Sequence, residues 1–319
     1  MNLSLIIPVY NEENNLLILY HAIHETMDSI KYNWKIIFVD DCSTDGSLVV
    51  LKDLAQKDPR HVQVIVFRRN YGQTAAIAAG IDHSDGDIVI LMDADMQNDP
   101  ADIPVMLAKL DEGYDLVSGW RKDRKDPFLS RIVPSRIANG LISWVTGVHL
   151  HDYGCTLKAY RREILSGFRL YGEMHRFIPA YACASGARVT EIVVHHHPRK
   201  YGKSKYGIER TLKVLLDLLT VKFLLSFSVS PIYIFGGVGI SMIFLSLVTL
   251  LFLAVRRIFF STSVLGSPFF QLGIMVFALG FQTILMGLIA ELLMRTYHET
   301  VDKPTYTIRE EINAESVQK

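Results

Sequence analysis

Three polar side chains stand at alternate positions directly after an apolar run, in the stretch LMDADMQNDP from residue 91 to residue 100. In an extended chain, residues two apart project to the same side, so Asp93, Asp95 and Gln97 can offer several oxygen atoms to one hard cation. Magnesium or manganese held in this way usually keeps positions open for phosphate oxygens. The spacing therefore predicts a divalent-metal site for a phosphate-bearing ligand, although a solvated acidic turn would show the same Asp-x-Asp pattern.

The segments around this stretch predict a sheet that brings further polar residues to the same edge. Apolar, β-rich runs alternate with segments of helical periodicity, which indicates βαβ units and a mainly parallel sheet covered on both faces. We expect strands over residues 3–9, 35–39, 62–67, 87–92 and 115–118, and helices over 13–30, 47–56, 74–83 and 100–112. Ligands of such sheets collect at the carboxyl ends of the strands. The polar clusters expected there are Tyr10-Asn11-Glu12, Asp40-Asp41, Arg68-Arg69-Asn70 and Asp93-Ala94-Asp95.

Acidic residues at the end of the second strand suit a nucleotide. Asp40 and Asp41 can accept hydrogen bonds from a ribose hydroxyl or from a base N–H group. The chain has no G-x-G-x-x-G motif, which argues against a dinucleotide-dependent dehydrogenase.

Two basic segments follow the predicted metal site. Residues 121–136 are rich in Lys and Arg and are expected to form a mobile loop, and KYGKSKYG, residues 200–207, is a Gly-rich basic loop. Fixed cations beside an acidic metal site can offset the repulsion between two phosphate groups that must approach each other. Taken one at a time, each of these Arg and Lys residues reads equally well as a solvated surface charge.

The C-terminal part is apolar enough for a membrane. The stretches 232–255 and 269–290 each exceed the roughly 20 apolar residues that a helix needs to cross a bilayer, so we expect two spans rather than buried core helices. Between residues 223 and 290 the charged residues are Arg256 and Arg257, while several Lys and Arg flank the pair outside, which favours both termini in the cytoplasm. TLKVLLDLLTVKFLLSF, from residue 211, has the pattern of a helix in the membrane interface, with a third span as the alternative.

Other candidate metal ligands fit poorly. Cys42, Cys155 and Cys183 are widely spaced and are expected to be reduced thiols. The run His195-His196-His197 cannot share one ion in a strand, because neighbouring side chains point to opposite faces.

The motifs taken together resemble the family-two glycosyltransferases of the GT-A fold, and among them the polyprenyl-phosphate sugar transferases such as dolichyl-phosphate mannose synthase and the bacterial bactoprenol glucosyltransferases. SLIIPVYNEENNL is similar to the first strand and nucleotide-binding loop of that family, IIFVDDCSTDGS to its second, and RRNYGQTAAIAAG to the segment that precedes the metal motif DADMQNDP. GWR, DYGCTLKAYRRE, HRF and KYGKSKYG follow in the order of the family. The Gln-x-x-Arg-Trp motif of processive members is absent, which favours transfer of a single sugar.

The resemblance assigns roles to particular residues. It implies Mg²⁺ or Mn²⁺ as cofactor, held with the donor diphosphate by Asp93, Asp95 and Gln97. It implies a uridine site at Pro8, Tyr10, Glu12 and Asp40, with Asp41 beside them. It also implies a phosphate-binding set, of which Arg121, Arg136 and Lys205 are expected to serve catalysis, and which is completed by Arg199 and Ser204.

The expected reaction moves a sugar, most simply glucose from UDP-glucose, to undecaprenyl phosphate at the cytoplasmic face of the membrane, with inversion at the anomeric carbon. A phosphate monoester is already largely ionised at neutral pH, so no strong general base is required. Alternatives are GDP-mannose or another UDP-sugar, a different acceptor for the same fold, or a catalytically silent nucleotide-sugar-binding scaffold. A channel is disfavoured because the spans offer no polar path.

The expected domain plan follows the chain. A cytoplasmic GT-A domain, an α/β fold, occupies residues 1–208, and juxtamembrane amphipathic helices occupy 209–231. Spans at 232–255 and 269–292 are joined by an extracytoplasmic loop, 256–268, and followed by a cytoplasmic tail, 293–319, whose end we expect to be disordered. Expected partners are the UDP-sugar, the polyprenyl phosphate and membrane lipids, with no nucleic acid. The sequence does not fix the oligomeric state; two spans allow helix association, and a homo-oligomer, with a tetramer as a guess, is one option.

Overall fold

The computed structural model describes residues 1–122, 133–165, 174–198, 231–260, 266–300 and 305–314, together with residues 170, 218 and 264. The chain forms two compact units, one of Met1–Leu225 with Pro304–Lys319 and one of Ser226–Lys303. The basic loop at 200–207 and most of the segment expected to lie in the membrane interface fall outside the described residues.

The first unit is built on an eight-stranded sheet in the order β7-β5-β6-β4-β1-β2-β3-β8. Its centre, β4-β1-β2-β3, is parallel, while β6 runs antiparallel to both β4 and β5 and β8 runs antiparallel to β3. The expected α/β architecture is thus confirmed, with antiparallel pairs added towards both edges. The strands are β1 Asn2–Val9, β2 Asn33–Asp40, β3 Val62–Phe67, β4 Ile88–Leu91, β5 Leu116–Trp120, β6 Lys158–Arg161, β7 Val189–Val193 and β8 Ile308–Ile312.

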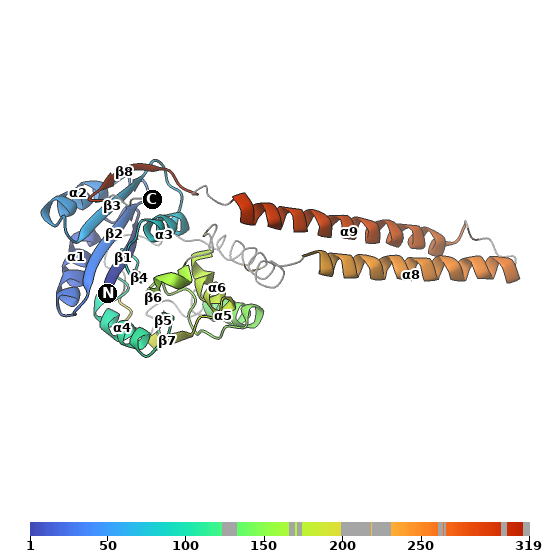
Figure 1. Cartoon of the computed structure of the whole chain (residues 1–319), viewed down its shortest axis with the longest axis horizontal. Coiled ribbons are helices and arrows are strands. Elements are labelled where there is room, and N and C mark those ends of the chain that lie inside the picture. Colours follow the sequence, from blue (N-terminus) through green and yellow to red (C-terminus); the bar gives the residue numbers. More distant parts are fainter. Residues whose placement is uncertain are drawn as a thin grey trace. The chain divides into compact units, whose positions relative to one another are not determined.

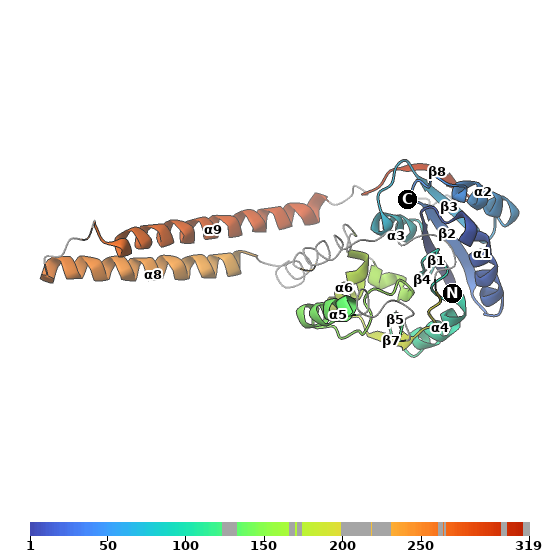
Figure 2. The ribbon, with the colours of Figure 1, turned by 180° about the vertical axis from the view of Figure 1, so that it is seen from behind.

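Helices cover both faces of this sheet, and Figures 1 and 2 show α1 and α3 on opposite sides of β1 and β2. Alternate residues of a strand point to opposite faces, so Leu5 and Ile7 of β1 pack with α1, α2 and α4, while Ile6 packs with α3, α5 and α6. The helices are α1 Glu13–Asp28, α2 Ser47–Lys57, α3 Gln73–Asp82, α4 Ile103–Asp111, α5 Val133–Thr146 and α6 Ile178–Ala184, with short 3-10 turns η1 Pro100–Asp102, η3 Arg162–Leu165 and η4 Met174–Phe177.

The prediction of a loop over residues 121–136 needs correction. The segment 121–136 is not a loop throughout, because α5 begins at Val133 and includes Arg136. Pro134 lies in the first turn of this helix, where its missing N–H group costs nothing, and Ile142 is buried in the core. The basic composition hid this helical pattern.

The expected C-terminal tail contributes a strand to the sheet. In Figure 1, β8 lies beside β3, and the register pairs Val64 with Ile312 and Val66 with Glu310. Just before it, the Tyr306 ring stacks on Phe67 with centroids 5.2 Å apart, and its hydroxyl donates to Asp82 at 2.9 Å. The sequence IREEI did not predict a strand because three consecutive charged residues stand between its two apolar ones, which an edge strand with one solvent-exposed face can tolerate.

The second unit is a pair of helices, α8 Pro231–Phe260 and α9 Pro268–Thr300. Both are long and apolar enough to cross a membrane, and only 17% of the most apolar stretch of each is buried. The core helix of a soluble protein would be mostly buried, and soluble proteins rarely expose apolar surface of this extent. Both helices extend beyond the limits expected from the sequence, so that α8 runs into the expected connecting loop and α9 into the expected tail.

Small residues allow α8 and α9 to approach each other closely. A Cβ atom added at Gly239 would lie 2.6 Å from the carbonyl oxygen of Gly280, and one added at Gly280 would lie 2.8 Å from the carbonyl oxygen of Gly239. Ser246 is buried and donates to the carbonyl oxygen of Gly273 at 2.7 Å. This is the packing of small residues that holds apolar helices together in lipid.

Replacing Gly280 by Ile is expected to separate the two helices, because the new side chain would meet backbone atoms that cannot move aside. The expected cost is about 1–3 kcal/mol of the unfolding free energy, measured as a lower apparent Tm of the detergent-solubilised protein. Gly237→Ile is the matched control, because a Cβ at Gly237 meets nothing within 4 Å. Equal Tm values for the two variants would show that close packing at Gly280 does not stabilise the pair.

Candidate active site

A cleft of about 250 Å³ lies at the carboxyl ends of the central parallel strands. Loops that follow β1, β2, β3 and β4 converge on it, as expected for an open α/β sheet. Of the residues predicted from the sequence it brings together Pro8, Tyr10, Glu12, Asp41, Asp93 and Asp95, and its remaining lining residues are Val9, Asn70, Gly72, Gln73, Ala76 and Ala94. Asp40 and Gln97 are not among the lining residues.

The acidic pair is presented by a turn and not by an extended strand, which corrects the expectation from the spacing. β4 ends at Leu91, and Met96 has a left-handed backbone with φ of 60°. The Asp95 carboxylate accepts a hydrogen bond from the amide of Gln97 at 3.1 Å, which closes the turn. The strict alternation of an extended strand therefore does not continue to Gln97, whose part as a ligand stays a prediction.

Two side chains from other elements hold the carboxylate of Asp93. Gln73, the first residue of α3, donates from Nε2 to Oδ1 at 2.7 Å, and Thr156 donates from Oγ1 to Oδ2 at 2.7 Å. Asp95 is buried, and Asp93 is half-buried. Each carboxylate oxygen that accepts one such bond keeps a further lone pair for another partner.

These residues fit a divalent cation such as Mg²⁺ or Mn²⁺. The donor set consists of hard carboxylate oxygens, fixed in direction by Gln73 and Thr156, at the edge of a cleft open to a larger ligand. The fit rests on Asp93 and Asp95, while the predicted part of Gln97 gains no support from the geometry.

Asp40 and Asp41 differ in what they do. Asp41 accepts hydrogen bonds from the amides of Tyr71 and Gly72, at 2.6 and 2.8 Å, and so fixes the entry to α3. Burial raises the pKa of Asp41, and these two amides offset part of the rise. Asp40 is buried and accepts from the amide of Ser43, and burial also raises its pKa. Asp41 is thus both a lining residue and a support of the loop.

Arg121 lies in a tight ion pair that the sequence did not predict. Its Nε donates to Oδ2 of Asp152 at 2.7 Å, and its Nη2 donates to Oδ1 at 3.0 Å, so that the pair is bidentate. Only 14% of the Arg121 side chain and 4% of the Asp152 side chain is exposed. Burial lowers the pKa of Arg121, but the attraction of Asp152, with a smaller one of Asp93, more than compensates, and the net pKa is raised. Arg121 therefore stays cationic beside the turn that carries Asp93 and Asp95.

Lys158 is a second buried basic residue close enough to Arg121 to interact with it electrostatically. Lys158 is 3% exposed, and its Nζ donates to the carbonyl oxygens of Tyr153 and Cys155. Burial lowers the pKa of Lys158 to about 8, in spite of the opposing effects of Cys155 and Asp152, and burial raises the pKa of the Cys155 thiol to about 11. Through these two hydrogen bonds Lys158 stabilises the loop that carries Asp152 and Thr156.

The remaining predicted phosphate-binding residues are not brought to the cleft in the described part of the chain. Arg136 is an exposed residue of α5 and is not among the lining residues. Arg199, Ser204 and Lys205 lie outside the described residues.

His175, His195 and His197 have separate partners. His175 is buried and shares a hydrogen bond of 2.7 Å with the hydroxyl of Thr74. His195 bonds to Asp102 at 2.7 Å and His197 bonds to Asp99 at 2.9 Å, so the histidine run joins two different carboxylates.

Sequence reasoning missed Gln73, Thr156, Asp152 and Lys158. The last three fall in one twelve-residue stretch, DYGCTLKAYRRE, whose mixture of acid, hydroxyl and base directly before a strand was the available signal. Gln73 stands at a helix start after Gly72, whose φ of 92° marks a sharp entry to the helix.

Comparison with known proteins agrees with this geometry. Residues 4–168 match the family described as "Glycosyl transferase family 2". The chain is 40% identical to dodecaprenyl-phosphate galacturonate synthase of Rhizobium johnstonii, over 97% of this chain and 93% of that protein. It is 38% identical to undecaprenyl-phosphate 4-deoxy-4-formamido-L-arabinose transferase of Pseudomonas fluorescens, over 96% of this chain and 88% of that protein.

Among solved structures, glucosyl-3-phosphoglycerate synthase of Mycobacterium tuberculosis, in complex with Mn²⁺, uridine diphosphate and phosphoglyceric acid, is similar with a TM-score of 0.52. The match covers 69% of this chain and 78% of that chain at 18% identity. At that identity the likeness shows a shared fold.

Proposed function

This chain belongs to glycosyl transferase family 2, and from that premise we propose that it transfers one sugar from a nucleotide sugar to a polyprenyl phosphate at a membrane surface. The observation that carries the proposal is the cleft in which Asp93 and Asp95 stand beside Tyr10, Glu12 and Asp41. A nucleoside diphosphate sugar offers a base and ribose for one side of this cleft and a diphosphate for the other.

Asp93 and Asp95 would hold Mg²⁺ or Mn²⁺, and this ion would neutralise charge that develops on the departing diphosphate. Arg121 adds a fixed cation near the same turn. An oxygen of the acceptor phosphate attacks the anomeric carbon, the bond from that carbon to the diphosphate oxygen breaks, and the nucleoside diphosphate leaves with the electron pair. Attack from the face opposite the leaving group inverts the anomeric centre.

The acceptor is proposed from the two relatives, both of which are named for a polyprenyl phosphate. An isoprenoid chain leaves the bilayer at a cost of about 0.8 kcal/mol for each CH₂ group, so an enzyme for such a lipid has to work at the membrane. The apolar helices α8 and α9 are suited to anchor it there.

The strand β8 supports a hairpin topology. Residues before α8 and after α9 belong to one sheet, because β8 pairs with β3. If α8 and α9 each cross the bilayer, both flanks must then lie on one side. The flanking Lys and Arg residues favour the cytoplasm for that side, and we propose it as the location of the catalytic unit.

The donor is proposed to be a UDP-sugar with a modified sugar in place of the glucose expected from the sequence. One relative is named for galacturonate and the other for a formamidoarabinose, and neither for glucose. A uronic acid and a modified pentose would use the same nucleotide and metal contacts.

A donor panel tests the proposal. The purified protein is incubated with undecaprenyl phosphate, manganese and, in separate reactions, UDP-galacturonate, UDP-4-deoxy-4-formamido-L-arabinose, UDP-glucose and GDP-mannose. We expect one modified UDP-sugar to give a lipid product whose mass equals the acceptor plus one sugar residue. Binding of UDP-sugars without a lipid product from any donor would instead indicate a nucleotide-sugar-binding scaffold.

A further inference from the structure

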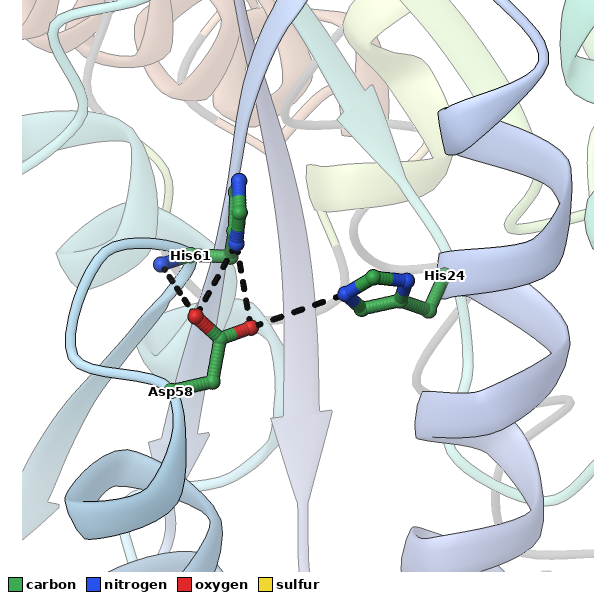
Figure 3. A group of neighbouring side chains, drawn as sticks. All are labelled: His24, Asp58 and His61. Carbon is green, nitrogen blue, oxygen red and sulfur yellow. Dashed lines mark hydrogen bonds and ion pairs between the residues drawn. The ribbon is translucent and has the colours of Figure 1, made fainter.

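A cluster of two histidines and one aspartate lies at the end of the sheet opposite the cleft. His24 is in the last half of α1, Asp58 directly follows α2, and His61 directly precedes β3. Figure 3 shows the three side chains converging, and one ligand atom from each lies within 4.8 Å of the others. Their side chains are 33%, 16% and 22% exposed in that order, so an ion can reach them from solvent. Nothing in the glycosyl transfer uses these residues, because the cleft is at the carboxyl ends of the strands.

The hydrogen bond of His24 to Asp28 orients its ring for an ion. Nδ1 of His24 lies 2.8 Å from the Asp28 carboxylate, which accepts a bond from an N–H group at that nitrogen. In the neutral ring, Nε2 is then an acceptor, and it faces Oδ2 of Asp58 at 3.9 Å. Two acceptors that face each other across this gap leave room for a cation between them. A carboxylate behind one ring nitrogen and a metal at the other is the usual arrangement of metal-binding histidines.

A proton on His24 Nε2 would not form a good hydrogen bond to Asp58 across this distance. If His24 were an imidazolium, its Nε2–H group would point to Asp58 over 3.9 Å, which is longer than the roughly 3.2 Å limit of a good N–H···O bond. Ligand atoms around tetrahedral Zn²⁺, with bonds of about 2.0 Å, lie about 3.3 Å apart. The distances from one oxygen, Oδ2 of Asp58, to His61 Nδ1, 3.1 Å, and to His24 Nε2, 3.9 Å, lie on either side of that value.

Neighbouring groups hold the other two ligands in place. The hydroxyl of Tyr20 donates to Oδ2 of Asp58 at 3.0 Å, and the amide of His61 donates to Oδ1 at 3.2 Å. The indole ring of Trp34 stacks on His61, with centroids 4.1 Å apart and planes 19° apart. Both the carboxylate and this imidazole are thus oriented before an ion arrives, which reduces the cost of binding it.

We propose that His24, Asp58 and His61 form a binding site for a divalent transition metal ion of the Zn²⁺ class, through His24 Nε2, an Asp58 carboxylate oxygen and His61 Nδ1, with water as fourth ligand. Imidazole nitrogens with a carboxylate suit Zn²⁺ better than Mg²⁺, which prefers oxygen. Binding displaces the proton on His61 Nδ1 to solvent. The ion joins α1 to the connection between α2 and β3, so its effect is on stability.

Calorimetric titration of ZnCl₂ into the full-length, detergent-solubilised protein tests the site. The protein is free of any histidine tag, stripped with chelator, dialysed, and kept in excess Mg²⁺ so that the oxygen ligands of the cleft are occupied. We expect one Zn²⁺ per chain and a rise in the apparent Tm of the protein. The same protein with Co²⁺ should show the strong visible absorption of a four-coordinate ion.

Variants separate this cluster from other histidines. His61→Gln and His24→Gln should each weaken Zn²⁺ binding at least about 100-fold and remove the Tm rise, since each lacks one of three ligands. Asp28→Asn keeps all three ligands and should weaken binding about 10-fold. Its side chain is 58% exposed, so it provides a variant that folds. His83→Gln is the matched control. His83 does not belong to the cluster, and its Nε2 lies 3.4 Å from the Glu311 carboxylate.

Two results would overturn the proposal. One is the absence of Zn²⁺ binding to the Mg²⁺-saturated wild-type protein. The other is Zn²⁺ binding with equal affinity and stoichiometry in wild type, His24→Gln and Asp28→Asn, which would place the ion elsewhere in the chain.

Discussion

Replacing Asp95 by Asn is expected to lower kcat for sugar transfer by about 10³-fold or more. Asn keeps an oxygen that can accept the amide of Gln97, which in the native protein donates to Asp95 at 3.1 Å, so the turn itself should survive. The substitution removes one negative charge from the pair that would hold the divalent ion. Turnover is measured as formation of the lipid-linked sugar.

Binding measurements distinguish loss of the ion from loss of the fold. Asp95→Asn should bind Mn²⁺ at least about tenfold more weakly in the presence of UDP, as seen by electron paramagnetic resonance, while its circular dichroism stays that of the wild type. Asp85→Asn is the control, because Asp85 is exposed and outside the cleft, and its turnover should be unchanged.

Chelation addresses the same ion in the unaltered protein. Excess EDTA should abolish transfer, and added Mn²⁺ or Mg²⁺ should restore it. An Asp95→Asn enzyme within tenfold of wild type, or full activity in excess chelator, would show that the carboxylate pair does not hold a catalytic ion.

The parallel centre of the fold was predictable because it follows local rules. The strand expected over residues 62–67 is β3 Val62–Phe67, and the helix expected to start at residue 47 starts at Ser47. Buried parallel strands are continuous apolar runs, and their helices show a 3.6-residue period. The edges of the sheet do not follow these rules. β8 carries charged residues on its solvent-exposed face. It pairs with β3, a strand more than 200 residues away in the sequence.

The candidate site was predictable in composition but not in geometry. Asp93 and Asp95 were identified by their place after a buried strand, and both line the cleft. The alternation rule failed at Met96, because its left-handed backbone ends the extended conformation before Gln97. Asp152 could not be paired with Arg121 from the sequence, because 31 positions separate them and the side-chain contact arises only when β5 and β6 pair.

Replacing Arg121 by Met is expected to lower both stability and turnover. The carboxylate of Asp152, which is 4% exposed, would lose its bidentate partner, and breaking a buried ion pair by removing one partner costs about 3–5 kcal/mol of unfolding free energy. The loss of a fixed cation near the turn that carries Asp93 and Asp95 should lower kcat/KM by about 10²-fold or more. Arg121→Lys keeps the charge but cannot donate to both oxygens of Asp152, so it should recover only part of either quantity.

The double variant Arg121→Met/Asp152→Asn separates these two effects. Removing the charge of Asp152 should restore most of the lost stability, measured by thermal unfolding, because the buried charge that lost its bidentate partner is then gone. If Arg121 also acts on the donor diphosphate, the double variant should bind UDP with manganese at least about tenfold more weakly than Asp152→Asn alone. Both of these proteins lack Asp152, so any direct part that this carboxylate has in the reaction cancels in the comparison. Equal UDP affinities would instead mean that Arg121 serves to neutralise Asp152 and that the cations for the diphosphate come from elsewhere in the chain.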